Sequence, residues 1–144
     1  MEEVLIKVRG MQSLEEQHEE PIEVVSVGQR YDEDGFMCIA YDEVVDATES
    51  GVVQVAKNLL KIKEGQVEVI KEGAVETHMV FIPNKSTYSY FSTPFGELEV
   101  SVSTSKIVRT PTEKGFQMQI YYNLEMNQQF LSKCKVDLTI EFQR

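Results

Sequence analysis

Apolar and polar residues alternate along most of the chain, and this pattern predicts β-strands. In residues 88–104, Leu98, Val100 and Val102 share one parity, while glutamate and serine residues occupy the positions between them. Alternation with a period of two is typical of an antiparallel sheet with one buried and one solvated face. The same alternation recurs in residues 4–8, 67–69, 77–81, 118–124 and 134–142. The chain is therefore predicted to be all-β.

Turn residues separate the predicted strands at short intervals. Asp34-Gly35, for example, falls between two apolar stretches and is predicted to be a hairpin turn, where glycine accepts a positive φ. Many short strands joined by close turns predict an antiparallel sandwich or barrel. Closure removes the exposed sheet edges, so we expect a single antiparallel barrel of about 8–10 strands spanning residues 1–144. Its last strand, residues 129–143, would then pair with its first, residues 2–12.

Residues 50–63 allow two interpretations. One face of a helix would be formed by Val52, Val55, Ala56, Leu59 and Leu60. A strand is favoured for residues 57–63, because they lead into a Glu-Gly turn and a second alternating stretch. Residues 50–57 are left open between a short helix and a strand.

Composition and charge restrict the class of protein. The 144 residues, 42% hydrophobic and 26% charged, are enough for one globular domain with its own core. A formal net charge of −10 argues against nucleic acid and anionic membrane surfaces as partners, because both would repel the chain. The first residues do not resemble a secretory leader, and no apolar run is long enough for a membrane helix. The two isolated cysteines, Cys38 and Cys134, are predicted to be buried, reduced thiols, and a cytoplasmic location is expected.

Several segments, taken together, resemble a known family. They are residues 61–73, 79–81, 90–104 and 121–124, with Thr93-Pro-Phe-Gly96 and the strand after it as the most specific part. In this order they resemble the YwiB-like family of small bacterial proteins, whose function is uncharacterised. The resemblance implies a calycin-type, lipocalin-like β-barrel, and it supplies no activity and no catalytic residues.

The chain departs from better-known calycins in two ways. It contains no tryptophan, so the Gly-x-Trp signature of lipocalins is absent. The Arg-x-Tyr pair that holds a fatty-acid carboxylate in intracellular lipid-binding proteins is also absent, and residues 139–142 stand in its place. Because a fold does not fix a function, lipid transport is not implied.

The candidate catalytic and metal-binding residues have simpler interpretations. His18 lies among four glutamates and is interpreted as part of a solvated acidic loop rather than a metal site. His78 is interpreted as a surface histidine on a strand, because no nucleophile or orienting partner accompanies it. Residues 32–35 lack the spacing of a calcium loop, and there is no nucleophile elbow or phosphate-binding loop. We therefore expect no cofactor and no metal, and a non-enzymatic protein is favoured over a hydrolase or isomerase with an acid–base pair in the barrel mouth.

Tyrosines provide the candidates for a binding site. Tyr88, Tyr90 and Tyr122 are assigned to the inward parity, with Thr104 on a neighbouring apolar face. An eight-stranded barrel is just wide enough to hold one small ligand, and tyrosines inside it could orient a polar group. The commoner alternative is that these tyrosines are core aromatics whose hydroxyl groups reach the rim.

Two functional hypotheses follow. The first is a non-enzymatic cytoplasmic binding module whose interior holds a small, partly apolar ligand. The alternative is a filled barrel that acts as a scaffold through protein contacts, as a homodimer or with another partner. The alternative rests on Phe91, Phe95 and Leu131, which are apolar at nominally polar or turn positions.

Overall fold

The computed structural model describes residues 2–12, 22–47, 52–73, 76–93, 96–126 and 129–143. These residues form ten strands, all of them joined into one sheet. The strands are β1 (Glu2–Gln12), β2 (Ile22–Glu33), β3 (Phe36–Ala47), β4 (Val52–Lys63), β5 (Gln66–Glu72), β6 (Glu76–Phe81), β7 (Lys85–Thr93), β8 (Gly96–Pro111), β9 (Gly115–Met126) and β10 (Gln129–Phe142).

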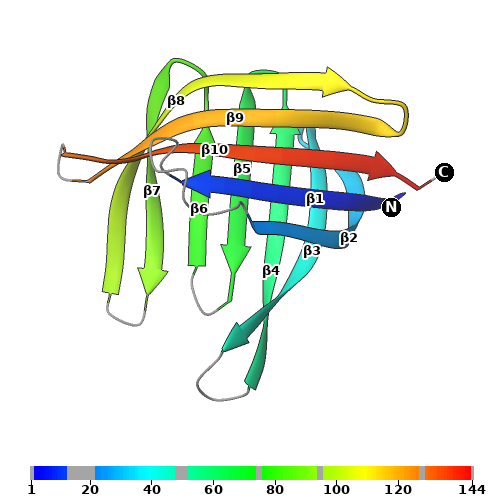
Figure 1. Ribbon diagram of the computed structural model, residues 1–144, viewed down its shortest axis with the longest axis horizontal. Helices are drawn as coiled ribbons and strands as arrows, with labels where there is room; N and C mark the ends of the chain where they lie inside the picture. Colours follow the sequence, from blue (N-terminus) through cyan, green and yellow to red (C-terminus); the bar gives the residue numbers. More distant parts are fainter. Residues whose placement is uncertain are drawn as a thin grey trace.

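The sheet closes on itself into an antiparallel barrel, which confirms the predicted fold. Each strand pairs with its neighbour in sequence, and β1 pairs with β10, with Ile6 directly opposite Ile140. The predicted pairing of the first and last strands is therefore confirmed. Strands β3–β7 run upright in Figure 1, and β1, β2, β9 and β10 run across them.

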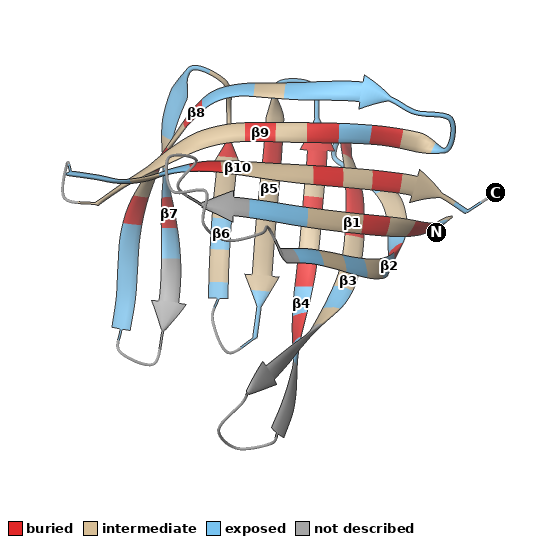
Figure 2. Ribbon diagram, viewed as in Figure 1, coloured by how far each residue is buried: buried red, intermediate tan, exposed pale blue. Residues whose placement is uncertain are grey.

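Strand β8 connects these two directions. It begins beside β7 and then bends to follow β9 (Figure 1). Its register against β9 shifts between Thr104 and Lys106, as expected where a strand turns a barrel corner. The burial of β8 follows the same geometry, because its middle is buried while both of its ends are exposed (Figure 2).

Residues 52–63 form one continuous strand, β4. Its pairing with β3 runs from Val52 opposite Ala47 to Ile62 opposite Met37. The strand prediction for 57–63 is confirmed, and a helix over 52–57 is wrong; residues 50 and 51 lie outside the described part of the chain. The β-branched residues at positions 52, 53 and 55 favour a strand, and this part of β4 pairs with β3. No helix of the length and apolarity needed to cross a membrane occurs among the described residues.

The turn at Asp34-Gly35 is the predicted hairpin turn. It joins β2 to β3, and both residues have a positive φ, 54° at Asp34 and 82° at Gly35. Two successive residues with positive φ are typical of the tight turn whose twist matches that of a β-hairpin. The sequence pair therefore sets the register in which Glu33 pairs with Phe36.

The inward side chains of the strands form the hydrophobic core. Alternate residues are buried along β1, β9 and β10, as the sequence pattern predicts (Figure 2). The core cluster consists of Val4, Ile6, Ile39, Leu60, Ile62, Val67, Phe81, Val102, Phe116, Met118, Ile120, Leu138 and Ile140. Cys38 and Cys134 are buried free thiols, as predicted.

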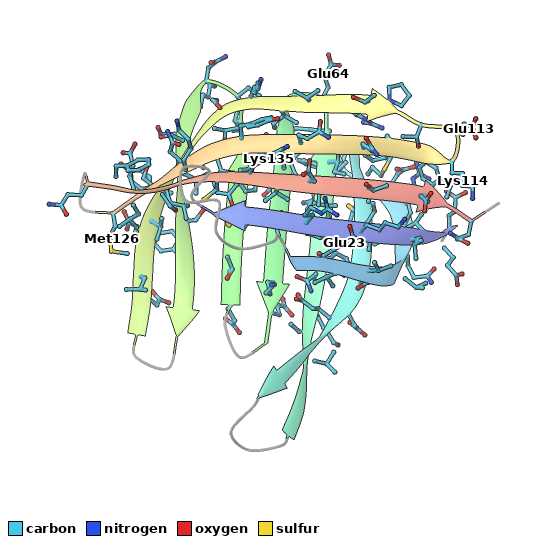
Figure 3. The ribbon with its side chains drawn as sticks, viewed as in Figure 1. Glu23, Glu64, Glu113, Lys114, Met126 and Lys135 are labelled. Carbon is cyan, nitrogen blue, oxygen red and sulfur yellow. The ribbon has the colours of Figure 1, made fainter. Side chains whose placement is uncertain are left out.

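Strand β9 extends along the barrel from one end to the other. Glu113 and Lys114 lie in the turn before it, and Met126 ends it at the opposite side of the molecule (Figure 3). Phe116, next to the turn that contains Glu113 and Lys114, is 3% exposed, whereas residues 121–126 are only partly buried. The two ends of the barrel are therefore packed differently.

Candidate functional site

The barrel interior is filled at the Phe116 end and contains a cavity toward the other end. The cavity has a volume of about 170 Å³. It is lined by Val8, Val24, Tyr41, Glu43, Asn58, Leu59, Leu60, Val69, Lys71, Met79, Phe81, Ile120, Tyr122, Val136 and Leu138. These residues come from strands on both sides of the barrel, so the cavity lies inside it and not on its outer surface.

One side of the cavity is apolar. Leu60, Phe81, Ile120 and Leu138 line it, and each of them is at most 4% exposed. They belong to the same hydrophobic cluster that fills the rest of the interior. This side offers a ligand contact with apolar surface only.

The other side carries a polar cluster from three adjacent strands. Lys71 Nζ lies 3.2 Å from Glu43 Oε2, and Asn58 Nδ2 donates a hydrogen bond of 3.4 Å to the same oxygen. Asn58 is only 4% exposed, while Glu43 and Lys71 keep 23% and 37% of their side-chain surface. Water therefore reaches the ion pair, and Asn58 lies beneath it.

Strand register explains why these residues meet. Tyr41 on β3 lies opposite Asn58 on β4, and Asn58 lies opposite Lys71 on β5. Residues directly opposite each other in an antiparallel pair share a face, so all three side chains point inward. Glu43 is in phase with Tyr41 and lies opposite the small residue Ala56.

Two partly buried tyrosines, Tyr41 and Tyr122, also line the cavity. Burial, with a smaller contribution from the charge of Glu43, raises the pKa of Tyr41 to about 12. Burial is the main reason why the pKa of Tyr122 lies well above its ordinary value, and the adjacent Cys134 thiol raises that pKa further. The Tyr122 ring packs against Phe81 with 4.8 Å between ring centroids. Both hydroxyl groups therefore keep their protons at neutral pH and can donate hydrogen bonds.

Of the sequence-predicted residues, Tyr122 and Thr104 point inward. They lie directly opposite each other on β9 and β8. Tyr122 lines the cavity, whereas Thr104 does not, although it is only 3% exposed. Its Oγ1 is buried with no hydrogen-bond partner among the described residues. The structure thus brings one of the four candidates, Tyr122, to the cavity.

The inward assignment of Tyr88 and Tyr90 is wrong. Their exposed fractions are 68% and 53%, and they lie on the outer face of β7. The hairpin pairs Thr93 with Gly96, which places Ser89 opposite the buried Val100. Ser89 therefore occupies the inner face, with no exposure at all. Once Val100 is taken as inward, the pairing of Thr93 with Gly96 requires this arrangement.

Four cavity residues are marked in the sequence by their phase along the strands. Glu43 is in phase with Ile39 and Tyr41, and Asn58 is in phase with Leu60 and Ile62. Lys71 likewise continues the phase of Val67 and Val69. A polar residue on the apolar parity of a strand is the pattern that would have identified Tyr41, Glu43, Asn58 and Lys71.

The remaining candidates do not join this site. His78 is an exposed strand residue, as predicted, and its Nε2 lies 2.9 Å from Glu68 Oε1 on the neighbouring strand. His18 lies outside the described residues, as do the side chains of Phe91 and Phe95. Leu131 is 51% exposed. Nowhere in the described part of the chain do three or more His, Cys, Asp or Glu side chains gather in a way that could hold a metal ion.

Comparison with known proteins gives consistent results. Residues 6–138 match the model of a domain of unknown function, DUF1934. The uncharacterized β-barrel protein YwiB of Bacillus subtilis (strain 168) is 33% identical over 70 residues, which are 49% of each chain. The match therefore spans about half the length of that relative.

A solved structure shows the same fold. The crystal structure of the ywiB protein from Bacillus subtilis matches with a TM-score of 0.78 and 24% sequence identity. The match covers 99% of this chain and 93% of the other. At this identity the likeness is evidence for the barrel fold and carries no information about a ligand.

Proposed function

The chain belongs to the DUF1934 family of domains of unknown function, and from this premise we propose that it is a non-enzymatic binding module that holds one small, partly apolar molecule. The ligand would occupy the cavity near Tyr41, Asn58 and Tyr122. The observation that supports this proposal is a cavity of about 170 Å³ with one apolar side and one polar side. Small-molecule sites combine these two features, because apolar contact gives affinity and a few polar groups give orientation.

The size of the cavity limits the ligand. Sites for drug-sized molecules are typically about 300–1,000 Å³, whereas an apolar cavity of about 150 Å³ can bind benzene. The cavity of about 170 Å³ therefore suits one substituted ring or a short branched chain. A fatty acid or a nucleotide would not fit without rearrangement of the core.

The fold and the thiols support the wider setting of the proposal. Sequential antiparallel connections are those of up-and-down barrels such as lipocalins, which supports a calycin-like relationship. Pairing of β1 with β10 closes all ten strands of the described residues into one barrel, which supports a single domain. Two free buried cysteines, Cys38 and Cys134, support a reducing, cytoplasmic environment.

A cavity-filling variant tests the proposal. Purified protein would be examined by native mass spectrometry for a retained molecule, and by thermal shift against a library of small ring compounds. Val69→Phe places extra volume in the cavity, and Val27→Phe, at a position 59% exposed on the outer face, is the matched control. We expect bound compounds whose stabilisation is lost in Val69→Phe and kept in Val27→Phe. Compounds that bind both variants equally, or no binding at all, would contradict the proposal.

A scaffold that acts through protein contacts is the second candidate, and one observation favours it. Tyr88, Tyr90 and Phe130 are 68%, 53% and 57% exposed on the outer faces of β7 and β10. Tyr88 and Phe130 lie in one row across strands β7 to β10. In this row Tyr88 is opposite Ser101, Ser101 is opposite Glu125, and Glu125 is opposite Phe130. Exposed aromatic residues on one outer face favour an interface. Light scattering would show a dimer that Tyr88→Lys abolishes, and a strict monomer with no retained partner would remove this candidate.

A further inference from the structure

The charges that face the cavity cancel each other. Among the described residues that line it, only Glu43 and Lys71 carry a formal charge. They are already in contact, with 3.2 Å between Lys71 Nζ and Glu43 Oε2. The cavity wall is therefore polar without offering an unbalanced charge of either sign.

This balance disfavours a charged ligand. A carboxylate near Lys71 would also lie near the Glu43 carboxylate, and an ammonium group near Glu43 would lie near the Lys71 ammonium group. In both cases repulsion opposes the attraction, while the ligand still loses its hydration on entering the barrel. An ionised ligand is therefore desolvated without compensation.

Neutral hydrogen-bonding groups, in contrast, are available in the cavity. Asn58 is 4% exposed and its Nδ2 donates to Glu43, while its Oδ1 supplies an acceptor on a residue that lines the cavity. Tyr41 lies directly opposite Asn58 and keeps its hydroxyl proton. The Asn58 side-chain carbonyl oxygen is an acceptor and the Tyr41 hydroxyl group is a donor, and both residues line the same cavity. Such a pair matches a ligand group that both donates and accepts, as an amide or an alcohol does.

From these observations we infer that the cavity selects an uncharged ligand, a single ring or short branched chain carrying an amide or alcohol group, and discriminates against its anionic and cationic analogues. This inference rests on the proposed binding function and adds the chemical class of the ligand. The apolar part of the ligand lies against Leu60, Phe81 and Ile120. Its polar group faces Tyr41 and Asn58.

Three probes of equal shape test the selectivity directly. Benzamide, benzoate and benzamidinium share one ring and a planar three-atom substituent, and they differ in charge. Binding to the unmodified protein would be followed by the methyl NMR shifts of Leu60, Ile120 and Leu138, which line the cavity. We expect saturable shifts with benzamide and at least about ten-fold weaker binding of both ions, in line with the loss that accompanies an unpaired buried polar group.

Glu43 and Lys71, the partly exposed ion pair of the cavity, are its rim charges. Removal of either rim charge should change which of the three probes is favoured. Glu43→Gln leaves Lys71 uncompensated, so benzoate should gain on benzamide, whereas Lys71→Met leaves Glu43 uncompensated, so benzamidinium should gain. A matched control lies on the outer face, where Lys7 Nζ is 3.7 Å from Glu141 Oε1, with side chains 39% and 24% exposed. The exposures of Lys71 and Glu43 are 37% and 23%. Lys7→Met and Glu141→Gln should leave all three affinities unchanged.

The outcomes separate this inference from the proposed function. If a charged probe binds the unmodified protein as tightly as benzamide, the inference is overturned, although the cavity is still a binding site. If none of the three probes shifts the cavity methyl groups, both the inference and the proposed function lose their basis. If neither rim variant changes the order of affinities, charge balance is not the cause of the selectivity. The probe series on the unmodified protein gives its answer even if a rim variant fails to fold.

Discussion

The two ends of the barrel have the same antiparallel strand pairing, but their inward-facing residues differ in polarity and in packing. At the filled end near Phe116, called the closed end, one inward row consists of Ile6, Ile140 and Phe116, opposite one another on β1, β10 and β9. At the end with the cavity, called the open end, an inward row consists of Tyr41, Asn58 and Lys71 on β3, β4 and β5. The first row is at most 3% exposed and is surrounded by core residues. The second row borders a cavity of about 170 Å³.

The difference shows where the barrel gives up stability. Large apolar residues at the closed end gain from leaving water and from close packing. Polar residues on the inner face cost free energy unless they are hydrogen-bonded, and the hollow beside them loses packing contacts. Places that depart from the rule of an apolar interior are expected to be functional sites. This contrast favours the end with the cavity as the functional end of the barrel.

Truncation of a core residue should show the largest difference between the ends. Ile140→Ala removes a side chain with no exposure, so the free energy of unfolding should fall by about 2–5 kcal/mol. Met79→Ala, at a partly exposed residue that lines the cavity, should cost clearly less, because an existing hollow is only enlarged. Urea unfolding measures both values. Equal losses would mean that the open end is packed as tightly as the closed end.

Adding a methyl group should affect stability differently at two glycines. A Cβ atom at Gly115 would overlap the carbonyl group of Ile140, so Gly115→Ala should cost about 1–3 kcal/mol. A Cβ atom at Gly10 would meet nothing within 4 Å, so Gly10→Ala should be neutral or slightly stabilising. Thermal unfolding of the two variants compares them. A neutral Gly115→Ala would contradict the close approach of β9 and β10 at the closed end.

Alkaline pH should destabilise the protein partly through Tyr41. The pKa of Tyr41 is raised from 10.0 to about 12 in the folded protein, so the unfolded chain loses this proton first. The stabilising contribution is therefore complete below pH 10 and is lost as the pH rises toward 12. We expect Tyr41→Phe to lose less stability over this range, as measured by urea unfolding at each pH. An identical pH dependence in the two proteins would show that the hydroxyl of Tyr41 is solvated.

Loss of the rim ion pair should have the smallest effect on stability. Glu43→Gln removes a partly exposed pair whose contribution is expected to be about 0–1 kcal/mol. The same substitution is expected to change ligand selectivity, so stability and binding should separate at this residue. A stability loss of several kcal/mol would instead identify Glu43 as part of the structural core.

Much of the fold could be predicted from local patterns. Alternation along residues 134–142 identified one apolar face, and the need to remove sheet edges identified the pairing of β1 with β10. The hairpin turn at Asp34-Gly35 could also be predicted from the sequence, because the turn requires a positive φ that glycine adopts easily. These features depend on neighbours in sequence or on a general property of sheets.

The site could be predicted only in part, because it depends on register among several strands. Alternation divides β7 into two faces without saying which one is inside, and Tyr88 and Tyr90 were assigned to the wrong face. The pairing of Ser89 with Val100 settles the question, and it belongs to two strands together. Likewise, Asn58 and Lys71 become neighbours only when β4 and β5 are aligned. The cavity itself depends on side-chain volumes from both sides of the barrel.

The most direct test of a barrel with one filled end and one hollow end is methyl NMR under xenon pressure. Xenon enters empty apolar cavities and shifts the methyl groups that line them. The structure predicts shifts at Leu60, Ile120 and Leu138, which line the cavity, and none at Ile6 and Ile140 at the closed end. Absence of shifts at the cavity residues, or equal shifts at both ends, would contradict this view of the interior.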